Sequence, residues 1–219
     1  MKKTFAFAAV ALALAGAFAW AAAKPTTIRI VGEDVVAHIE FEKGGRLALT
    51  SKPVSVRPDT YWTKSLSLVK KDDKARAWEL RGTDNFGGLA NVTVDAEQDK
   101  ILLLGKDLAL VVDGKPAEDP AGSGNMVIAV TVVVRGMNSE GYLPWAFDGK
   151  GFTLPMAAVK DADGKVLASG RCVVRDGRYG WFAWRYPAGW KGPFDVEVQA
   201  FLGPFEAKMA KTITPFEVK

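Results

Sequence analysis

The sequence contains only one cysteine and one histidine among its 219 residues. Because Cys172 has no second cysteine to pair with, no intramolecular disulfide can form, and packing has to hold the fold. Any catalytic triad or metal centre that needs histidine has to be built around His38. The sequence also lacks a G-x-S-x-G elbow, an H-E-x-x-H pair, a Walker loop and a dinucleotide-binding glycine fingerprint. We therefore expect no catalytic residues, no metal ligands and no cofactor.

Both rare residues lie in alternating stretches. His38 has the strand parity of Val36 and Glu40, which predicts the solvent-facing side of a strand. Cys172 has the parity of Ala168 and Val174, which predicts a buried small hydrophobic residue rather than a reactive thiol.

The sequence has no cluster of basic residues after its first few positions. Its 29 Lys and Arg side chains barely outnumber the 25 Asp and Glu side chains, and Lys2 and Lys3 belong to the segment treated next. Lys70 and Lys71 form the only adjacent basic pair in the rest of the chain. Nucleic-acid binding needs basic residues gathered on one face, so we expect no nucleic-acid partner.

The first 23 residues have the pattern of a secretory signal peptide. Lys2 and Lys3 precede an apolar run over 5–20, and small residues at 21–23 provide a cleavage site before Lys24. The run is shorter than the ~20 residues of a bilayer span and has no stop-transfer flank. We expect an exported protein, periplasmic or extracellular, that begins near Lys24 and has no stable membrane span after cleavage; a retained anchor is the alternative.

The remainder predicts an all-β fold. No stretch of 12 or more residues keeps a helical apolar period, whereas short alternating runs recur, as over 78–81, 91–95 and 194–200. Such strands have one dry and one wet face, which is typical of antiparallel sheets. The segment 126–134 is apolar at almost every position, so we expect it to be covered on both faces.

Asp-Gly pairs at 113–114, 148–149, 163–164 and 176–177 predict tight turns. The clearest hairpin spans 157–174 and turns at Asp163-Gly164. A calcium loop over 161–172 is disfavoured, because Lys165 and Cys172 stand where that loop needs oxygen ligands.

The segment Asp113–Asn125, which reads DGKPAEDPAGSGN, has no large apolar side chain. This composition predicts a linker or a long connection between sheets. We therefore expect a first module at 24–113, a linker at 114–125 and a second module at 126–219. A single larger sandwich is the alternative.

Each half resembles a known kind of module. The first half, with Pro58-Asp59-Thr60-Tyr61 leading into LSLVKKD, WELRG and NVTVDAEQ, resembles prealbumin-like modules of bacterial surface proteins. The second half, with 136–142, 155–159, DADGKVLASG and FDVEVQAFLGPF, resembles immunoglobulin-like modules of secreted bacterial proteins. The resemblance implies two antiparallel β-sandwich modules and transfers no catalytic residues. The chain departs from the antibody pattern because it lacks paired cysteines.

The stretch Tyr179–Tyr186 is the richest in aromatic residues. On an extended strand Phe182, Trp184 and Tyr186 share one face, and Tyr179, Trp181 and Arg185 share the other. We expect Trp184 in the core. The set with Arg185 is the candidate ligand-binding set, because exposed flat aromatic rings stack on sugars or on a protein partner. The alternative is that this face is covered by 187–193 or by the other module.

Together these features predict an exported, non-enzymatic protein with a structural or recognition role. One alternative is a carbohydrate-binding module that uses Tyr179, Trp181 and Arg185. A more distant one is a glycoside hydrolase, whose two carboxylates can lie far apart in the sequence. The expected partners are a polysaccharide or another exported protein.

Overall fold

The computed structural model describes residues 26–32, 34–119, 121–122, 124–176, 179–186 and 193–211. The predicted signal peptide at 1–23 lies outside the described residues. Apart from one short 3₁₀ helix at Gly87–Leu89, every regular element in the described ranges is a strand, so the all-β prediction is confirmed. Within those ranges no helix has the length and hydropathy needed to cross a membrane.

The strands, in chain order, are β1 (Thr26–Val31), β2 (Val35–Phe41), β3 (Gly45–Leu49), β4 (Val54–Val56), β5 (Asp59–Lys71), β6 (Ala77–Arg81), β7 (Asn91–Val94), β8 (Lys100–Leu103), β9 (Leu108–Glu118), β10 (Met126–Arg135), β11 (Gly141–Tyr142), β12 (Met156–Asp161), β13 (Val166–Arg171), β14 (Val173–Arg175), β15 (Tyr179–Arg185), β16 (Phe194–Gln199) and β17 (Ala207–Lys211).

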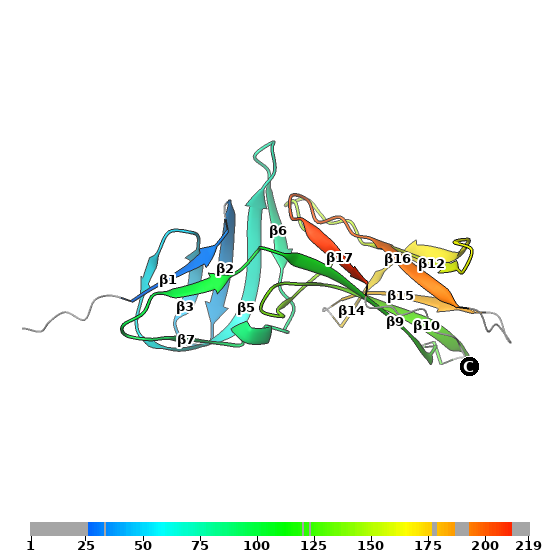
Figure 1. Cartoon of the computed structure of the whole chain (residues 1–219), viewed down its shortest axis with the longest axis horizontal. Coiled ribbons are helices and arrows are strands. Elements are labelled where there is room, and N and C mark those ends of the chain that lie inside the picture. The colour runs from blue at the N-terminus through cyan, green and yellow to red at the C-terminus, as the bar shows by residue number, and fades with distance from the viewer. Residues whose placement is uncertain are drawn as a thin grey trace, which may run out of the picture.

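These strands form four sheets, which fall into two groups along the chain (Figure 1). Strands β1 to β8 make a three-stranded sheet, ordered β4-β1-β8, and a five-stranded sheet, ordered β3-β2-β5-β6 with β7 on β5. Strands β9 to β17 make a six-stranded sheet, ordered β14-β15-β10-β9-β17 with β11 on β10, and a three-stranded sheet, ordered β13-β12-β16. In each group the first strand pairs in parallel with the last, as β1 does with β8 and β9 with β17.

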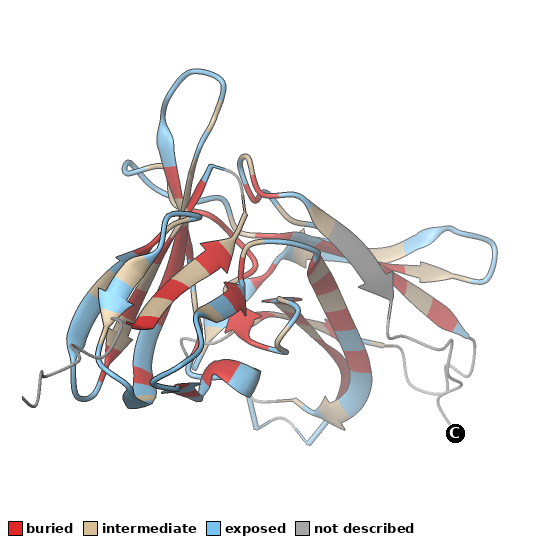
Figure 2. Ribbon diagram, turned by 60° about the vertical axis from the view of Figure 1, so that its left-hand side comes forward, coloured by how far each residue is buried: buried red, intermediate tan, exposed pale blue. Residues whose placement is uncertain are grey.

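The strands alternate between buried and exposed positions, which Figure 2 shows as bands along the ribbons. In β2, Ala37 and Ile39 are buried, whereas His38 and Glu40 are only partly covered. The prediction that His38 faces away from the core is therefore confirmed. Strand β10 follows its sequence pattern in part: 127–130 are all buried, whereas Met126 is exposed and Thr131 and Val133 are only partly covered.

The core of the second group lies between its two sheets. Trp184 in β15 meets Phe194 in β16 edge to face, with ring centroids 6.4 Å apart. Gly170 in β13 lies directly over the Phe182 ring, where a Cβ atom would come within 2.8 Å of it. Cys172 is fully buried, as predicted, and burial raises the pKa of its thiol to about 11.

The β12–β13 hairpin turns at Asp163-Gly164, as the sequence predicts. The Asp161 carboxylate accepts hydrogen bonds from the backbone amides of Asp163 and Lys165, at 3.0 and 2.9 Å. This carboxylate therefore closes the turn.

The structure differs from the predicted linker at 114–125. Residues 114–118 belong to β9 and pair with 126–130 of β10, so Asp113-Gly114 lies inside a strand and the turn is confined to 119–125. Pro116 has no amide hydrogen to donate to a neighbouring strand, and among the described residues β17 pairs with β9 at 108–112, not at Pro116. The boundary between the two groups of sheets lies at 104–107 instead, between β8 and β9.

The connection between β10 and β12 packs against the first group. The amide of Gly141 donates to the Asn85 carbonyl at 2.7 Å, and the Asn138 side chain donates to the Leu103 carbonyl at 2.8 Å. Phe147 forms an isolated bridge with Glu79 on the edge of β6. The two groups therefore share a hydrogen-bonded interface along β6 and the loops beside it.

Candidate functional site

The predicted strip occupies one face of β15. Tyr179 and Trp181 are half-buried and Arg185 is exposed. On the opposite face Trp184 is 8% exposed and contacts the core, which confirms its predicted position. The structure thus leaves part of the two aromatic side chains accessible.

Only part of the predicted set is brought together. The guanidinium that lies over the Trp181 ring, 4.8 Å from its centroid, belongs to Arg175 of β14. Arg185 instead forms an ion pair with Asp119. The sequence analysis did not include Arg175 in the candidate set, because this residue precedes the aromatic stretch. A predicted hairpin that pairs Arg175 with Tyr179 would have placed it beside the aromatic rings.

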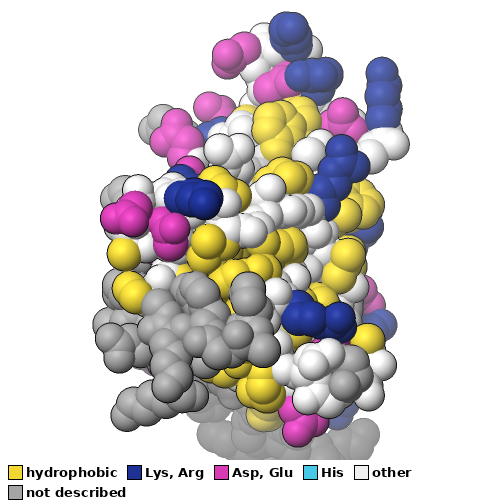
Figure 3. All heavy atoms as spheres, turned by 90° about the vertical axis from the view of Figure 1, so that its right-hand side faces the viewer, with side chains coloured by type: hydrophobic (Ala, Val, Ile, Leu, Met, Phe, Trp, Pro, Cys, Tyr) yellow, Lys and Arg dark blue, Asp and Glu magenta, His cyan; other side chains and the backbone are white. Residues whose placement is uncertain are grey.

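A hollow lies elsewhere, beside the turn between β5 and β6. This turn projects from the top of the molecule in Figure 1. The cleft has a volume of about 930 Å³, and its other wall is the segment 201–206 from the second group. Figure 3 shows the face seen from the right of Figure 1: side chains of both charge signs mingle at its top, and hydrophobic side chains lie across its middle. A cleft between two parts of a chain is a common place for a ligand.

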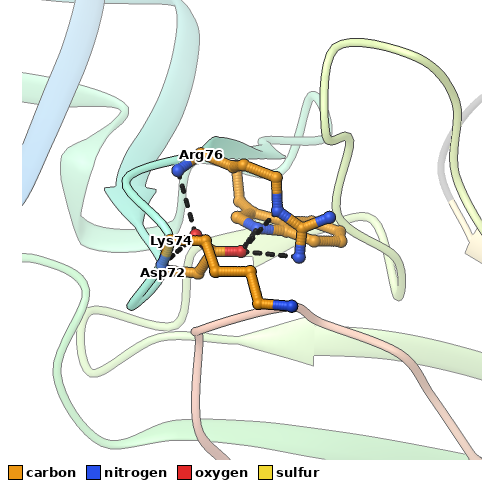
Figure 4. Close-up of polar contacts among 4 residues, drawn as sticks. Asp72, Lys74 and Arg76 are labelled. Carbon is orange, nitrogen blue, oxygen red and sulfur yellow. Dashed lines mark hydrogen bonds and ion pairs between the residues drawn. The ribbon is translucent and has the colours of Figure 1, made fainter.

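Asp72 organises the β5–β6 side of the cleft (Figure 4). Its carboxylate accepts hydrogen bonds from the backbone amides of Lys74 and Arg76 at 3.0 and 2.9 Å, and from the Arg76 side chain at 2.8 Å. It also accepts a hydrogen bond from the indole of Trp78 at 3.1 Å. Partial burial acts to raise the pKa of Asp72, but these hydrogen bonds outweigh it and lower the pKa to about 2. Asp72 therefore stays ionised and fixes both the turn and the tryptophan.

Trp78 joins the two walls of the cleft. It is 6% exposed, and the Phe201 ring meets it edge to face, with centroids 5.5 Å apart. The backbone at Gly203 approaches so closely that a Cβ atom there would lie 2.6 Å from the indole. Gly203 also has a φ of +59°, a conformation that glycine adopts readily. Phe201 itself is 52% exposed, so the cleft presents an aromatic ring on a buried support.

The rest of the cleft lining mixes apolar and charged side chains. Four acidic and three basic side chains line it: Asp34, Asp72, Asp73 and Glu206, and Lys70, Lys71 and Arg76. These residues come from three separate segments, at 34, at 70–76 and at 206, so no local pattern in the sequence could have grouped them.

His38 does not line the cleft, although it shares a sheet face with Val36, which does, and the register places it beside Ser67 of β5. Partial burial and the nearby Arg46 lower the pKa of His38. The Ser67 side chain hydrogen-bonds to the Glu79 carboxylate. Burial acts to raise the pKa of Glu79, but hydrogen bonds from Arg81 and Ser67 outweigh it, and the pKa is lowered.

Comparison with protein-family models, with curated proteins and with solved structures gave no match to this chain.

Proposed function

We propose that this chain is an exported, non-enzymatic recognition protein that binds carbohydrate in the cleft between the β5–β6 turn and the segment 201–206. In this proposal its two groups of sheets are β-sandwich modules of prealbumin-like and immunoglobulin-like type. The observation that carries the proposal is the exposed Phe201 ring, supported by buried Trp78 within a cleft whose charged side chains have both signs.

Carbohydrate suits this surface for two physical reasons. Each sugar hydroxyl both donates and accepts hydrogen bonds, so a mixture of carboxylate, ammonium and guanidinium groups can satisfy it. The C–H face of a sugar ring is apolar and packs on an exposed aromatic ring such as Phe201. A fixed Trp78 keeps that ring in place, which reduces the entropy lost on binding.

The low pKa of Asp72 supports recognition over a glycoside hydrolysis in which Asp72 is the general acid. A hydrolase needs a carboxylic acid whose pKa is raised, so that it can protonate the leaving group. In the cleft the pKa of Asp72 is lowered to about 2, because several donors hold its charged form. Glu140 does have a raised pKa, but its side chain is completely buried and cannot meet a substrate.

The face of β15 is a second candidate for the same class of ligand. It is favoured by the partial exposure of Tyr179 and Trp181 on one side of one strand. Its drawback is that Arg175 already lies over the Trp181 ring.

Affinity gel electrophoresis with a panel of neutral and charged polysaccharides tests the proposal, because a bound polysaccharide slows the migration of the protein. We expect at least one neutral polysaccharide to retard the protein, and Phe201→Ala to remove most of the retardation. Trp62→Ala is the matched control, because Trp62 is 53% exposed and lines no part of the cleft. Unchanged retardation of Phe201→Ala, together with its loss in Trp181→Ala, would move the site to β15. Retardation by none of the panel would overturn the proposal.

A further inference from the structure

A second hollow of about 490 Å³ adjoins the cleft, because Val69 and Trp78 line both. Its walls are the edge strand β6 and the segment 147–152, which belongs to the connection between β10 and β12. The sequence predicts the alternating run at 78–81 and the turn at Asp148-Gly149 that help to line this hollow, but it predicts no ligand-binding residue there.

The segment 147–152 is fixed to the sheet by its backbone. Phe147 exchanges two hydrogen bonds with Glu79, at 2.8 and 2.9 Å, and so continues the five-stranded sheet beyond β6. The chain then turns back, and the Asp148 carboxylate accepts hydrogen bonds from the amides of Lys150 and Gly151 at 2.9 and 3.0 Å. This turn holds Phe152 against Phe147, with ring centroids 4.9 Å apart.

Phe152 forms a supported aromatic platform. Its ring stacks on Trp145 with an interplanar angle of 23° and a centroid distance of 5.5 Å. Trp145 is 1% exposed, whereas Phe152 is 46% exposed. Because one side of the phenyl ring rests on a buried indole, its orientation is set before any ligand arrives.

A polar pair stands beside this platform. The Arg81 guanidinium lies 4.0 Å from the centroid of Phe147, and its Nε donates to Glu79 at 2.8 Å. This pair offers guanidinium donors and carboxylate acceptors next to an aromatic ring. The same combination, one exposed phenyl ring on a buried indole with charged groups of both signs, is present in the cleft at Phe201 and Trp78.

We infer that the ligand is a neutral β-1,4-linked chain of gluco-configured sugars that occupies both hollows at once, with one ring on Phe152 and another at Phe201. This inference rests on the proposed function. Sugars of this configuration carry their hydroxyls around the ring edge, which leaves both faces flat and apolar for stacking. A neutral chain fits the charges, because the second hollow adds Glu79, Arg81 and Lys150 and brings the total to five acidic and five basic side chains. Linked sugars that engage two platforms bind more tightly than one sugar does, since the second contact is intramolecular.

The test is calorimetric titration of the full protein with cello-oligosaccharides and chito-oligosaccharides of two to six units. We expect the affinity for at least one series to rise by about tenfold or more between the dimer and the hexamer. In Phe152→Ala this gain with length should be lost, while the affinity for the dimer changes little. Trp62→Ala should keep the gain, because Trp62 is similarly exposed and lines neither hollow.

Equal affinity for dimer and hexamer would overturn the inference that one ligand occupies both hollows. A gain in affinity with length that survives in Phe152→Ala would overturn it as well. Either result would leave the proposed function intact. Absence of binding to both series, with another neutral polysaccharide bound in the cleft, would overturn the sugar class inferred here. Absence of binding to every carbohydrate would overturn the proposed function itself. Thermal unfolding of Phe152→Ala would verify that the variant is folded.

Discussion

The hydroxyl of Tyr142 donates a hydrogen bond to Oε1 of Glu140 at 3.1 Å, and both side chains are fully buried. The other carboxylate oxygen accepts the backbone amide of Asn138 at 2.8 Å. These residues belong to the connection that hydrogen-bonds to the first group of sheets, so a buried acid lies at the junction between the two groups. Burial raises the pKa of Glu140, and it also raises the pKa of Tyr142, which remains a donor at neutral pH.

The first prediction concerns the pH dependence of stability. Because the pKa of Glu140 is higher in the folded state than in the unfolded state, the unfolded chain loses this proton at lower pH. The contribution of Glu140 to stability is therefore complete below about pH 4, near the unfolded pKa of a glutamate, and is lost as pH rises through the folded pKa.

Urea unfolding of the wild type and of Glu140→Gln between pH 4 and 8 measures this effect. We expect Glu140→Gln to gain stability relative to the wild type as the pH rises, because the amide never ionises. The Tyr142 hydroxyl can rotate to accept from the new amide group. A constant difference between the two proteins over this range would contradict the assignment.

A second prediction concerns Gly203. Gly203→Ala places a methyl group 2.6 Å from the Trp78 indole, in addition to straining a positive φ. Gly164→Ala is the matched control, because Gly164 has a φ of +79° but no atom within 4 Å of its Cβ position. The control should lower the free energy of unfolding by about 1–2 kcal/mol. Gly203→Ala should lower it by about 1–3 kcal/mol more. Equal losses in denaturant unfolding would mean that Gly203 and Trp78 are not in contact.

A third prediction distinguishes the two faces of β15. Trp184→Ala should lower the free energy of unfolding by about 3–5 kcal/mol, because the indole is buried in the core. Trp181→Ala should lower it much less, since that side chain is half-exposed. Denaturant unfolding gives both values, and iodide quenching of fluorescence reports exposure. Large and equal losses would show that both faces of β15 are covered.

A fourth prediction concerns proteolysis. A brief protease treatment that cuts the turn at 119–125 should leave two fragments that migrate together on size-exclusion chromatography. The reason is that β9 and β10, on either side of the turn, are hydrogen-bonded neighbours in one sheet. Separation of the fragments without denaturant would show that this pairing is too weak to hold them.

The sequence predicts the parts of this fold that depend on local patterns. Alternation places His38 and Trp184 on the correct faces, and Asp163-Gly164 marks a real hairpin. The same reasoning failed at Asp113-Gly114, where turn residues lie within a strand. Composition shows that Pro116 has no amide hydrogen to donate to a sheet, but it does not show that β9 continues through Pro116 as a strand paired with β10.

Local sequence patterns do not predict the cleft as a whole. Trp78 belongs to an alternating strand, and its hydrogen bond to Asp72 spans only six residues. The turn between β5 and β6 could therefore have been predicted from the local sequence. The contacts of Trp78 with Phe201 and Gly203 join segments more than 120 positions apart. Packing between the two groups of sheets, rather than any motif, creates the cleft.

The most direct test of a carbohydrate site in the cleft follows the tryptophan indole N–H signals of ¹⁵N-labelled protein during titration with cellohexaose and chitohexaose. The account predicts that the Trp78 signal shifts, because its indole lies under Phe201 and hydrogen-bonds to Asp72. The signal of Trp62, outside the cleft, should stay in place. A titration that moves the Trp181 signal and leaves Trp78 unchanged would contradict the account and place the ligand on β15.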